Sequence, residues 1–278
     1  MQTKRKVKNR LRRGIQIGIF SLIAVLAVGK GLKDAGALPW WPEISLHAIC
    51  PFGGVVTIYQ FITTGDFLPK LHSAAFILMA LGLITATLFG PIFCGYACPL
   101  GSYQEWIGRL GRKLFPKRYG KLIPPKVDRA LSYLRYGVLA LVVYQTAVVG
   151  KLVFADVDPY YALFNFFTGE VAWTALAVLG AVTVLSLIVE RPWCRYLCPY
   201  GALLGLFNRI RIFPVRRREA TCTHCKSCDR ACPMNINISK AGAVRDTRCI
   251  SCNQCLSGNA CPVPDTLTLS TPQGGDNA

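Results

Sequence analysis

The chain contains few acidic residues: 14 Asp and Glu stand against 32 Lys and Arg, which gives a formal net charge of +18 over 278 residues. In a soluble protein such an excess would favour binding to nucleic acid. Here the positive charge is unevenly placed, since residues 1–13 hold seven Lys or Arg and no acid, whereas residues 34–71 hold one Lys and three acids. This separation follows the positive-inside rule of membrane proteins, and we expect no nucleic-acid partner.

No small-residue cleavage site follows the first apolar stretch, so we expect this stretch to remain as an anchor and not to act as a signal peptide. A helix needs about 20 apolar residues to cross the hydrocarbon core of a bilayer. Four segments meet this requirement, namely 14–33, 72–93, 131–153 and 171–189. The sequence therefore predicts an all-α polytopic membrane domain with four transmembrane helices within residues 1–218.

The loops between these helices alternate in charge. The loop at 94–130 holds eight Lys or Arg and two acids, and the segment from 190 onward holds twelve against six. The loop at 151–170 holds one Lys and three acids. Because basic loops stay on the cytoplasmic side, we expect both termini and the loop at 94–130 to be cytoplasmic, in a multi-pass protein of the cell (inner) membrane.

Eight of the 13 cysteines fall in two runs, Cys222-x2-Cys225-x2-Cys228-x3-Cys232-Pro233 and Cys249-x2-Cys252-x2-Cys255-x5-Cys261-Pro262. In two-cluster ferredoxins the three closely spaced thiolates hold one [4Fe–4S] cluster, and the fourth, before Pro, ligates the other cluster. The spacing thus predicts two [4Fe–4S] clusters, one held by Cys222, Cys225, Cys228 and Cys261 and the other by Cys249, Cys252, Cys255 and Cys232. Two structural zinc sites are the alternative, since C-x2-C pairs also bind zinc.

The segment at 219–278 has few large apolar side chains and is too short to bury a sufficient core of its own. Bound clusters would supply the missing stability. We therefore predict a small cytoplasmic α+β 2[4Fe–4S] ferredoxin-like domain over 219–278. Five residues precede Cys261 where three are usual, so this crossing ligand departs from the common pattern.

A nine-residue pattern occurs twice, at the inner ends of the second and fourth predicted helices. Residues 93–101 read Phe-Cys-Gly-Tyr-Ala-Cys-Pro-Leu-Gly and residues 193–201 read Trp-Cys-Arg-Tyr-Leu-Cys-Pro-Tyr-Gly. Cysteines at i and i+4 share one helix face, so two such ends side by side would bring together Cys94, Cys98, Cys194 and Cys198. One interpretation is an additional metal, iron–sulfur or dithiol redox site. The other is close packing of small residues between membrane helices.

Each copy of the pattern is followed by a stretch with basic and apolar faces, at 100–115 and 200–218. We expect these stretches to form interfacial helices on the inner leaflet of the membrane.

The remaining cysteine, Cys50, lies in His47-Ala48-Ile49-Cys50-Pro51 on the predicted outer side. The surrounding apolar stretch at 44–62 is broken by Pro and Gly-Gly, as in segments that dip into a membrane without crossing it. With a histidine able to take protons, such a segment is one way to build a quinol pocket from His47 and Cys50. A packed extracytoplasmic loop is the alternative.

The combination of four apolar segments, two C-x3-C-P motifs and two ferredoxin runs resembles the NapH family, membrane ferredoxin-type subunits of quinol dehydrogenases, within a wider group of NosR and polyferredoxin-like proteins. The resemblance implies an electron-transfer subunit that takes electrons from the quinone pool. It passes them towards an extracytoplasmic reductase system of the periplasmic nitrate reductase type, through an iron–sulfur, cytochrome or flavin partner. The alternative is a polyferredoxin-like assembly factor that reduces copper or a cofactor during maturation of a respiratory enzyme.

Reporter fusions test the predicted topology. Alkaline phosphatase, which is active only outside the cytoplasm, should be active when fused after Gly65 and after Asp158, and inactive when fused after Lys121 and after Ala278, because the basic segments stay inside. Activity of a cytoplasmic reporter at Gly65 would contradict the predicted outer position of Cys50.

Overall fold

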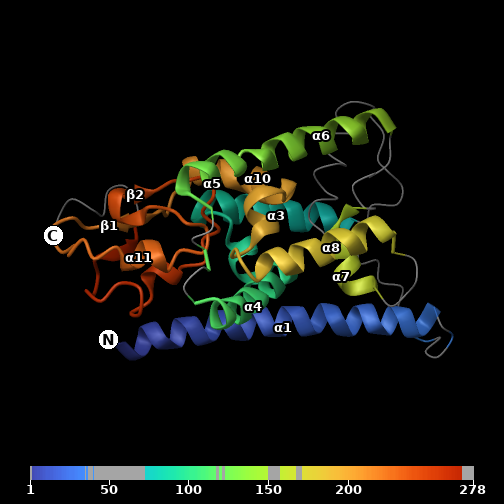
Figure 1. Cartoon of the computed structure of the whole chain (residues 1–278), viewed down its shortest axis with the longest axis horizontal. Helices are drawn as coiled ribbons and strands as arrows, with labels where there is room; N and C mark the ends of the chain where they lie inside the picture. Colours follow the sequence, from blue (N-terminus) through green and yellow to red (C-terminus); the bar gives the residue numbers. More distant parts are fainter. Residues whose placement is uncertain are drawn as a thin grey trace.

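The computed structural model of the chain describes residues 2–34, 36, 40, 73–116, 119–120, 123–149, 157–166 and 171–270. The predicted quinol-site residues His47 and Cys50 lie outside these described residues. The long helices run roughly along the length of the molecule, with α1 and α6 at opposite edges in this view and α3 and α8 between them (Figure 1). The three strands and α11 lie at the end of the molecule where α1 begins (Figure 1).

Each of the four predicted transmembrane segments contains a helix. These helices are α1 (Gln2–Asp34), α3 (Ser73–Phe89), α6 (Leu134–Val149) and α8 (Trp173–Ser186). Within the described residues only α1 carries a stretch, Arg10–Lys33, that is long and apolar enough to cross a membrane, while part of α3 and all of α8 form shorter apolar helices. The four-span topology therefore remains a prediction.

The ends of α3 and α8 have local causes. After α3 the chain turns at Gly90, whose φ of 85° is accessible to glycine without strain, and Pro91 follows. After α8 the chain turns at Arg191, whose φ is 53°, and Pro192 begins the next helix. Helix α3 ends five residues before Cys94, and α8 ends eight residues before Cys194.

The two copies of the nine-residue pattern fold alike. A short helix carries the first cysteine, the second cysteine is the N-cap of the next helix, and proline takes the first position of that helix, where its missing N–H costs nothing. The first copy consists of the π-helix η2 (Phe93–Ala97) and α4 (Pro99–Leu114). The second consists of α9 (Pro192–Tyr196) and α10 (Pro199–Leu206), which the 3₁₀-helix η4 (Phe207–Arg209) extends. The remaining described helices are α5 (Pro125–Leu131), α7 (Pro159–Asn165), α11 (Ser227–Arg230), η5 (Ile238–Lys240) and η6 (Gln254–Leu256).

Helix α4 buries polar residues on one face and exposes apolar as well as basic residues near its end. Its buried face includes the polar residues Ser102, Gln104 and Glu105, while Leu110 and Leu114 are half exposed or more. In water this orientation would be unfavourable, because it hides polar groups and exposes apolar ones. It suits a helix that contacts lipid on one side and polar protein on the other, as predicted for the stretch at 100–115.

A small antiparallel sheet with the order β2-β1-β3 forms the ferredoxin-like end. Strand β1 (Val215–Arg217) pairs with β2 (Ala243–Val244) and with β3 (Leu267–Leu269), so that Val215 lies opposite both Val244 and Leu269. Since β1 ends just before residue 218, the sheet reaches across the predicted domain boundary.

One hydrophobic core also crosses that boundary. Ala86 of α3, Val142 of α6 and Leu204 of α10 belong to the same cluster of buried residues as Met234 and Ile250 of the ferredoxin-like segment. The segment therefore obtains its core by packing on the helices. This packing compensates for the few large apolar side chains in its own sequence.

Candidate iron–sulfur site

The structure brings the first three cysteines of the first run together with the last cysteine of the second run. Cys222, Cys225, Cys228 and Cys261, the first cysteine set, all line one pocket that encloses about 350 Å³, part of it open to solvent. Cys261 reaches this pocket although five residues separate it from Cys255. The set is graded in exposure, from Cys225, which is exposed, to Cys228, which is buried.

The other four ferredoxin cysteines, Cys232, Cys249, Cys252 and Cys255, form the second cysteine set. Burial raises the pKa of Cys232, and the neighbouring Cys252 and Cys249 raise it further. Burial also raises the pKa of Cys255, with added contributions from Cys252, Cys249 and Cys232. All four cysteines pack against the same buried cluster, so the fold brings Cys232 to the second run as the Cys-Pro spacing predicts. Their role as ligands of one cluster stays a prediction. Thiolates so placed are favoured only when a cation neutralises them.

The two cysteine runs share one backbone conformation. Residues on each side of the middle cysteine are left-handed: His224 and Lys226 beside Cys225 have φ of 51° and 54°, and Ser251 and Asn253 beside Cys252 have φ of 49° and 55°. Left-handed residues in such loops turn successive N–H groups towards one side and make concavities that bind anions, including iron–sulfur clusters. The N–H of Ser227 accordingly donates to the Cys225 sulfur, and that of Gln254 donates to the Cys252 sulfur. These loops therefore fit an anionic cluster.

Among the residues that the structure describes, no three Cys, His, Asp or Glu side chains converge closely enough to hold a single metal ion. A zinc site requires four ligands at about 2.0–2.3 Å from one ion. In a [4Fe–4S] cluster each thiolate binds a different iron, so its ligands are spread around a larger object. The choice between clusters and zinc is therefore left to the metal and sulfide content of the protein.

The cysteines of the repeated pattern also meet, and we call Cys94, Cys98, Cys194 and Cys198 the cysteine quartet. Cys94 and Cys194 are buried, whereas Cys98 and Cys198 are partly buried. The Cys94 sulfur interacts electrostatically with Cys98 and Cys194, and the Cys198 sulfur with all three others. Polar groups also face these sulfurs, since Gln104 donates to Cys194 at 3.7 Å and the N–H of Gly201 donates to Cys198 at 3.3 Å.

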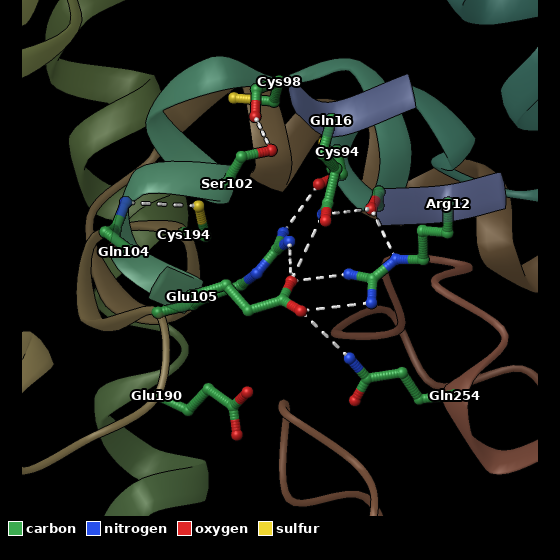
Figure 2. Close-up of polar contacts among 12 residues, drawn as sticks. Arg12, Gln16, Cys94, Cys98, Ser102, Gln104, Glu105, Glu190, Cys194 and Gln254 are labelled. Carbon is green, nitrogen blue, oxygen red and sulfur yellow. Dashed lines mark hydrogen bonds and ion pairs between the residues drawn. The ribbon is translucent and has the colours of Figure 1, made fainter. Parts of the chain in front are cut away.

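A buried carboxylate, Glu105, lies beside the quartet with cations around it (Figure 2). Arg12 of α1 pairs with Glu105 at 2.6 Å and Arg191 pairs with it at 2.7 Å, and Arg109 reaches it from one turn along α4 at 2.9 Å. Burial alone would raise the pKa of Glu105, but Arg191 and Arg12 hold it well below its usual range. Glu105 is therefore an anion that neutralises cations buried in the same place.

The two arginines join Glu105 to the first cysteine pair. Arg191 donates to the carbonyl oxygen of Cys94 at 2.7 Å, and Arg12 donates to the carbonyl oxygen of Gly95 at 3.1 Å. Arg191 is left-handed, which costs a residue other than glycine about 1–3 kcal/mol when the surroundings impose it. Strain of this kind concentrates at functional sites, and here it places a fully buried guanidinium between Cys94 and Glu105.

The first copy of the pattern is in direct contact with the second ferredoxin run. A Cβ atom on Gly95 would lie 2.5 Å from the carbonyl oxygen of Ile250 and 3.0 Å from Cα of Cys252, so no larger residue fits there. Gln254 donates to Glu105 at 3.2 Å, and Asn253 donates to the Tyr96 hydroxyl at 3.2 Å. The quartet and the second cysteine set are therefore neighbours across this contact.

A second buried carboxylate, Asp128 of α5, connects the second copy of the pattern to the ferredoxin-like segment. It pairs with Arg195, which follows Cys194, and with Arg248, which precedes Cys249, at 3.6 Å. Tyr196 donates to it at 2.7 Å and Asn235 at 3.4 Å. Asp128 thus ties the second copy of the pattern to the ferredoxin-like segment.

Neither the motifs nor the hydropathy of the sequence marks Glu105 or Asp128 as a site residue. A signal was present: they are the two acids in the strongly basic loop at 94–130. An isolated acid among basic residues at the end of apolar helices indicates a buried ion pair, although its partners cannot be read from the sequence.

Comparison with known proteins agrees with this geometry. A family model described as a 4Fe-4S binding domain matches residues 71–118 and again residues 171–219. Each match contains one C-x3-C-P motif, so the model recognises the two copies of the repeat and not the ferredoxin runs. No solved structure matches the chain.

Several relatives extend over most of the chain. It is 30% identical to YccM of Escherichia coli over 82% of this chain and 64% of that relative, so it spans less than two thirds of YccM. It is 32% identical to the ferredoxin-type protein NapH of Haemophilus influenzae over 63% of this chain and 61% of NapH. It is 30% identical to the methylamine utilization ferredoxin-type protein MauN of Methylobacillus flagellatus over 69% of each.

Fold, cysteine arrangement and comparisons define an iron–sulfur protein of the ferredoxin type that carries electrons. More narrowly, the chain belongs to the NapH-type membrane ferredoxin family, which is related to NosR. The predicted resemblance is confirmed.

Glu105→Gln should destabilise the protein strongly. The change leaves Arg12 and Arg191 buried without their counter-charge, which costs about 3–5 kcal/mol, measured as a lower unfolding temperature in detergent. Because the pKa of Glu105 is depressed, its contribution is complete above the unfolded value of about 4.3 and is lost only as the pH falls through the lower folded value. The difference from wild type should therefore stay constant from about pH 5 to 8 and shrink in more acidic buffer.

Glu190→Gln is the matched control. Glu190 pairs at 2.7 Å with Arg112, whose side chain is 43% exposed, and burial raises the pKa of Glu190. Glutamine removes a charge that burial disfavours and leaves Arg112 in contact with water, so the cost should be much smaller than that of Glu105→Gln. Equal effects of the two substitutions would show that the Glu105 contacts do not stabilise the fold.

Proposed function

We propose that this protein is the membrane iron–sulfur component of a quinol dehydrogenase, which moves electrons between the quinone pool and an extracytoplasmic reductase system. The observation that carries the proposal is the succession of three adjoining cysteine sets, which starts where the apolar helices end and finishes at the surface of the ferredoxin-like segment. A structural protein would have no need to align three groups of thiols in this way.

The contacts define the order of the three sets. The quartet adjoins the second cysteine set through the contact between Gly95 and Cys252. The second set adjoins the first because Cys228 belongs to the same buried cluster against which Cys255 and Cys232 pack. The second cysteine set thus lies between the other two, as a relay requires.

The residues that would hold the clusters are those assigned from the sequence. The first cysteine set would hold one [4Fe–4S] cluster and the second set the other, and the quartet would hold a further metal or iron–sulfur centre. When bound, such groups supply one-electron transfer, and the protein supplies their position and surroundings. Arg211 is one such influence, since its buried guanidinium donates to the Cys249 sulfur at 3.8 Å and to the Ser251 hydroxyl at 3.3 Å. A fixed cation there stabilises negative charge on the second set.

The quartet is the part that connects the ferredoxin-like end to the membrane. The hydrocarbon core is about 30 Å thick, so an acceptor on the far side requires a redox group at the inner helix ends or a quinone that carries the charge across. The buried thiols of Cys94 and Cys194 are at these helix ends. The quinol site itself is assigned to His47 and Cys50, and the multi-pass topology with a cytoplasmic ferredoxin-like segment is part of the same proposal.

The cluster content tests the proposal directly. Protein purified without oxygen should hold about eight iron atoms per chain, four per cluster, or more if the quartet binds iron, with matching acid-labile sulfide and electron paramagnetic resonance signals on reduction. Cys225→Ala should remove one cluster and destabilise the ferredoxin-like segment, because Cys232 and Cys261 each cross between the runs. Stoichiometric zinc without sulfide would refute the assignment.

The quartet is tested by the additivity of substitutions. If its four thiols form one centre, Cys94→Ser and Cys198→Ser should each abolish quinol-dependent electron transfer about as fully as the double variant, since ligands of one centre act as a unit. The iron held by the first and second cysteine sets should remain in all three variants. Single variants with wild-type rates would make the thiols packing residues, and a double variant much worse than either single would mean that the two motifs act separately.

A further inference from the structure

The first cysteine set is open to the aqueous phase. Cys225 is exposed and Cys222 and Cys261 are partly buried, whereas the second set lies between them and the helices. In Figure 1 the sheet and α11 lie at one end of the molecule, and the apolar helices α3 and α8 extend away from that end. A soluble macromolecule can therefore contact a redox centre in this pocket. The apolar helices, which lipid would surround, lie towards the other end of the molecule.

Basic side chains gather around this opening. Arg217 and Lys226 line the pocket, and the Arg230 charge acts on the Cys225 sulfur. Lys240 is exposed on η5, which packs against α11 through the hydrogen bond from Ser239 to Asp229 at 2.8 Å. The cations on this face therefore come from three elements that adjoin the pocket.

The acids of the same segment do not cancel these cations. Asp246 pairs with Arg248 at 2.8 Å. Glu219 is 81% exposed and pairs with Arg217 at 3.2 Å, so these two charges offset each other. Asp229, which accepts from Ser239, and the exposed Asp265 stand against four exposed cations, namely Arg218, Lys226, Arg230 and Lys240. The face around the pocket is therefore positively charged.

The mouth of the pocket also has an apolar edge. Pro262 and Val263 line it beside Cys261, and Pro264 next to them is exposed. A small apolar contact ringed by charges of one sign is typical of short-lived encounters between electron-transfer proteins, which bury less than about 1,200 Å². Charge complementarity steers such encounters and sets their rate.

We propose that an acidic, soluble one-electron carrier of the ferredoxin or flavodoxin class docks on this basic face, over the exposed first cysteine set. In each encounter one electron leaves the reduced carrier and is taken up by the centre held at this set, with no proton or group transferred. The protein thereby gains a connection to the soluble redox pool in addition to the quinone pool. This inference rests on the proposed function, because it requires a redox centre at Cys222, Cys225, Cys228 and Cys261.

Binding of oxidised flavodoxin to the full chain in lipid nanodiscs tests the docking apart from turnover. Affinity should fall at least tenfold between about 20 and about 200 mM salt, since screening weakens attraction between exposed charges. Arg230→Glu combined with Lys240→Glu should weaken binding about tenfold at low salt and remove most of the salt dependence, because both cations lie on the docking face. The rate at which reduced flavodoxin is oxidised by the chain should fall in parallel.

Lys113→Glu combined with Lys126→Glu is the matched control, since both lysines are exposed and neither lines the pocket. If both double variants lost the same flavodoxin affinity, the effect would come from the net charge of the protein and not from this face, and the proposal would be overturned. Flavodoxin binding that does not change with salt would overturn it as well. So would a result in which Arg230→Glu with Lys240→Glu weakens the attraction of this face to anionic lipid but leaves flavodoxin binding unchanged.

Iron and acid-labile sulfide are measured in every variant. If they are retained and flavodoxin does not bind, the docking proposal fails and the proposed function stands. If the wild-type chain holds no cluster, both fail together.

Discussion

The buried negative charge of two carboxylates is the constraint on which the rest of this structure depends. Glu105 and Asp128 are each about 1% exposed. Glu105 pairs with arginines of the helices and accepts a hydrogen bond from Gln254 of the ferredoxin-like segment. Asp128 pairs with Arg195 of the helices and with Arg248 of the ferredoxin-like segment. Removing one partner from such a group leaves a charge with neither water nor counter-ion, which costs several kcal/mol. The ion pairs therefore form only when both parts are in register, and they fix the position of the second cysteine set against the quartet.

This arrangement explains a difference between the two copies of the repeat. The position after the first cysteine is Gly95 in one copy and Arg195 in the other. At Gly95 the ferredoxin loop approaches so closely that a side chain would collide with Ile250. At Arg195 the guanidinium reaches Asp128. The two copies share the cysteines and the helix that begins at proline. The first copy contacts the second ferredoxin run directly through its backbone, and the second copy is joined to the ferredoxin-like segment by the ion pairs of Asp128. The two similar copies therefore bind the segment in different ways.

The grouping of the ferredoxin cysteines can be predicted from the sequence because ligand spacing is a local property. Three thiols two residues apart define a loop, and the left-handed residues beside Cys225 and Cys252 follow from that loop. The grouping of the quartet follows from the repeat, because two similar helix ends at the same end of one bundle place their cysteines side by side. The crossing of Cys232 and Cys261 required knowledge of how paired ferredoxin runs are built, and the fold brings each to the opposite run.

What the sequence does not predict are contacts between distant positions. Arg12 and Glu105 are 93 residues apart, and Gln254 and Glu105 are 149 apart, and no periodicity or spacing records such a pairing. Hydropathy also places the ends of the second and fourth predicted helices too late, at 93 and 189, whereas α3 ends at Phe89 and α8 at Ser186. Hydropathy continues to residue 93 past the end of α3 at Phe89, because Ile92 and Phe93 are apolar, but the left-handed turn at Gly90 ends the helix before them.

The shared core and the buried ion pairs together limit how far the ferredoxin-like segment can move. Because Leu204 and Val142 of the helices pack in one cluster with Met234 and Ile250, the ferredoxin-like segment cannot move away from the helices without exposing apolar surface and breaking the buried pair between Asp128 and Arg248. Such a movement would cost too much to occur in each turnover. In the proposed relay the second cysteine set would therefore exchange electrons with its neighbours at fixed separations, and only the first set, with Cys225 at the surface, would meet a partner that diffuses.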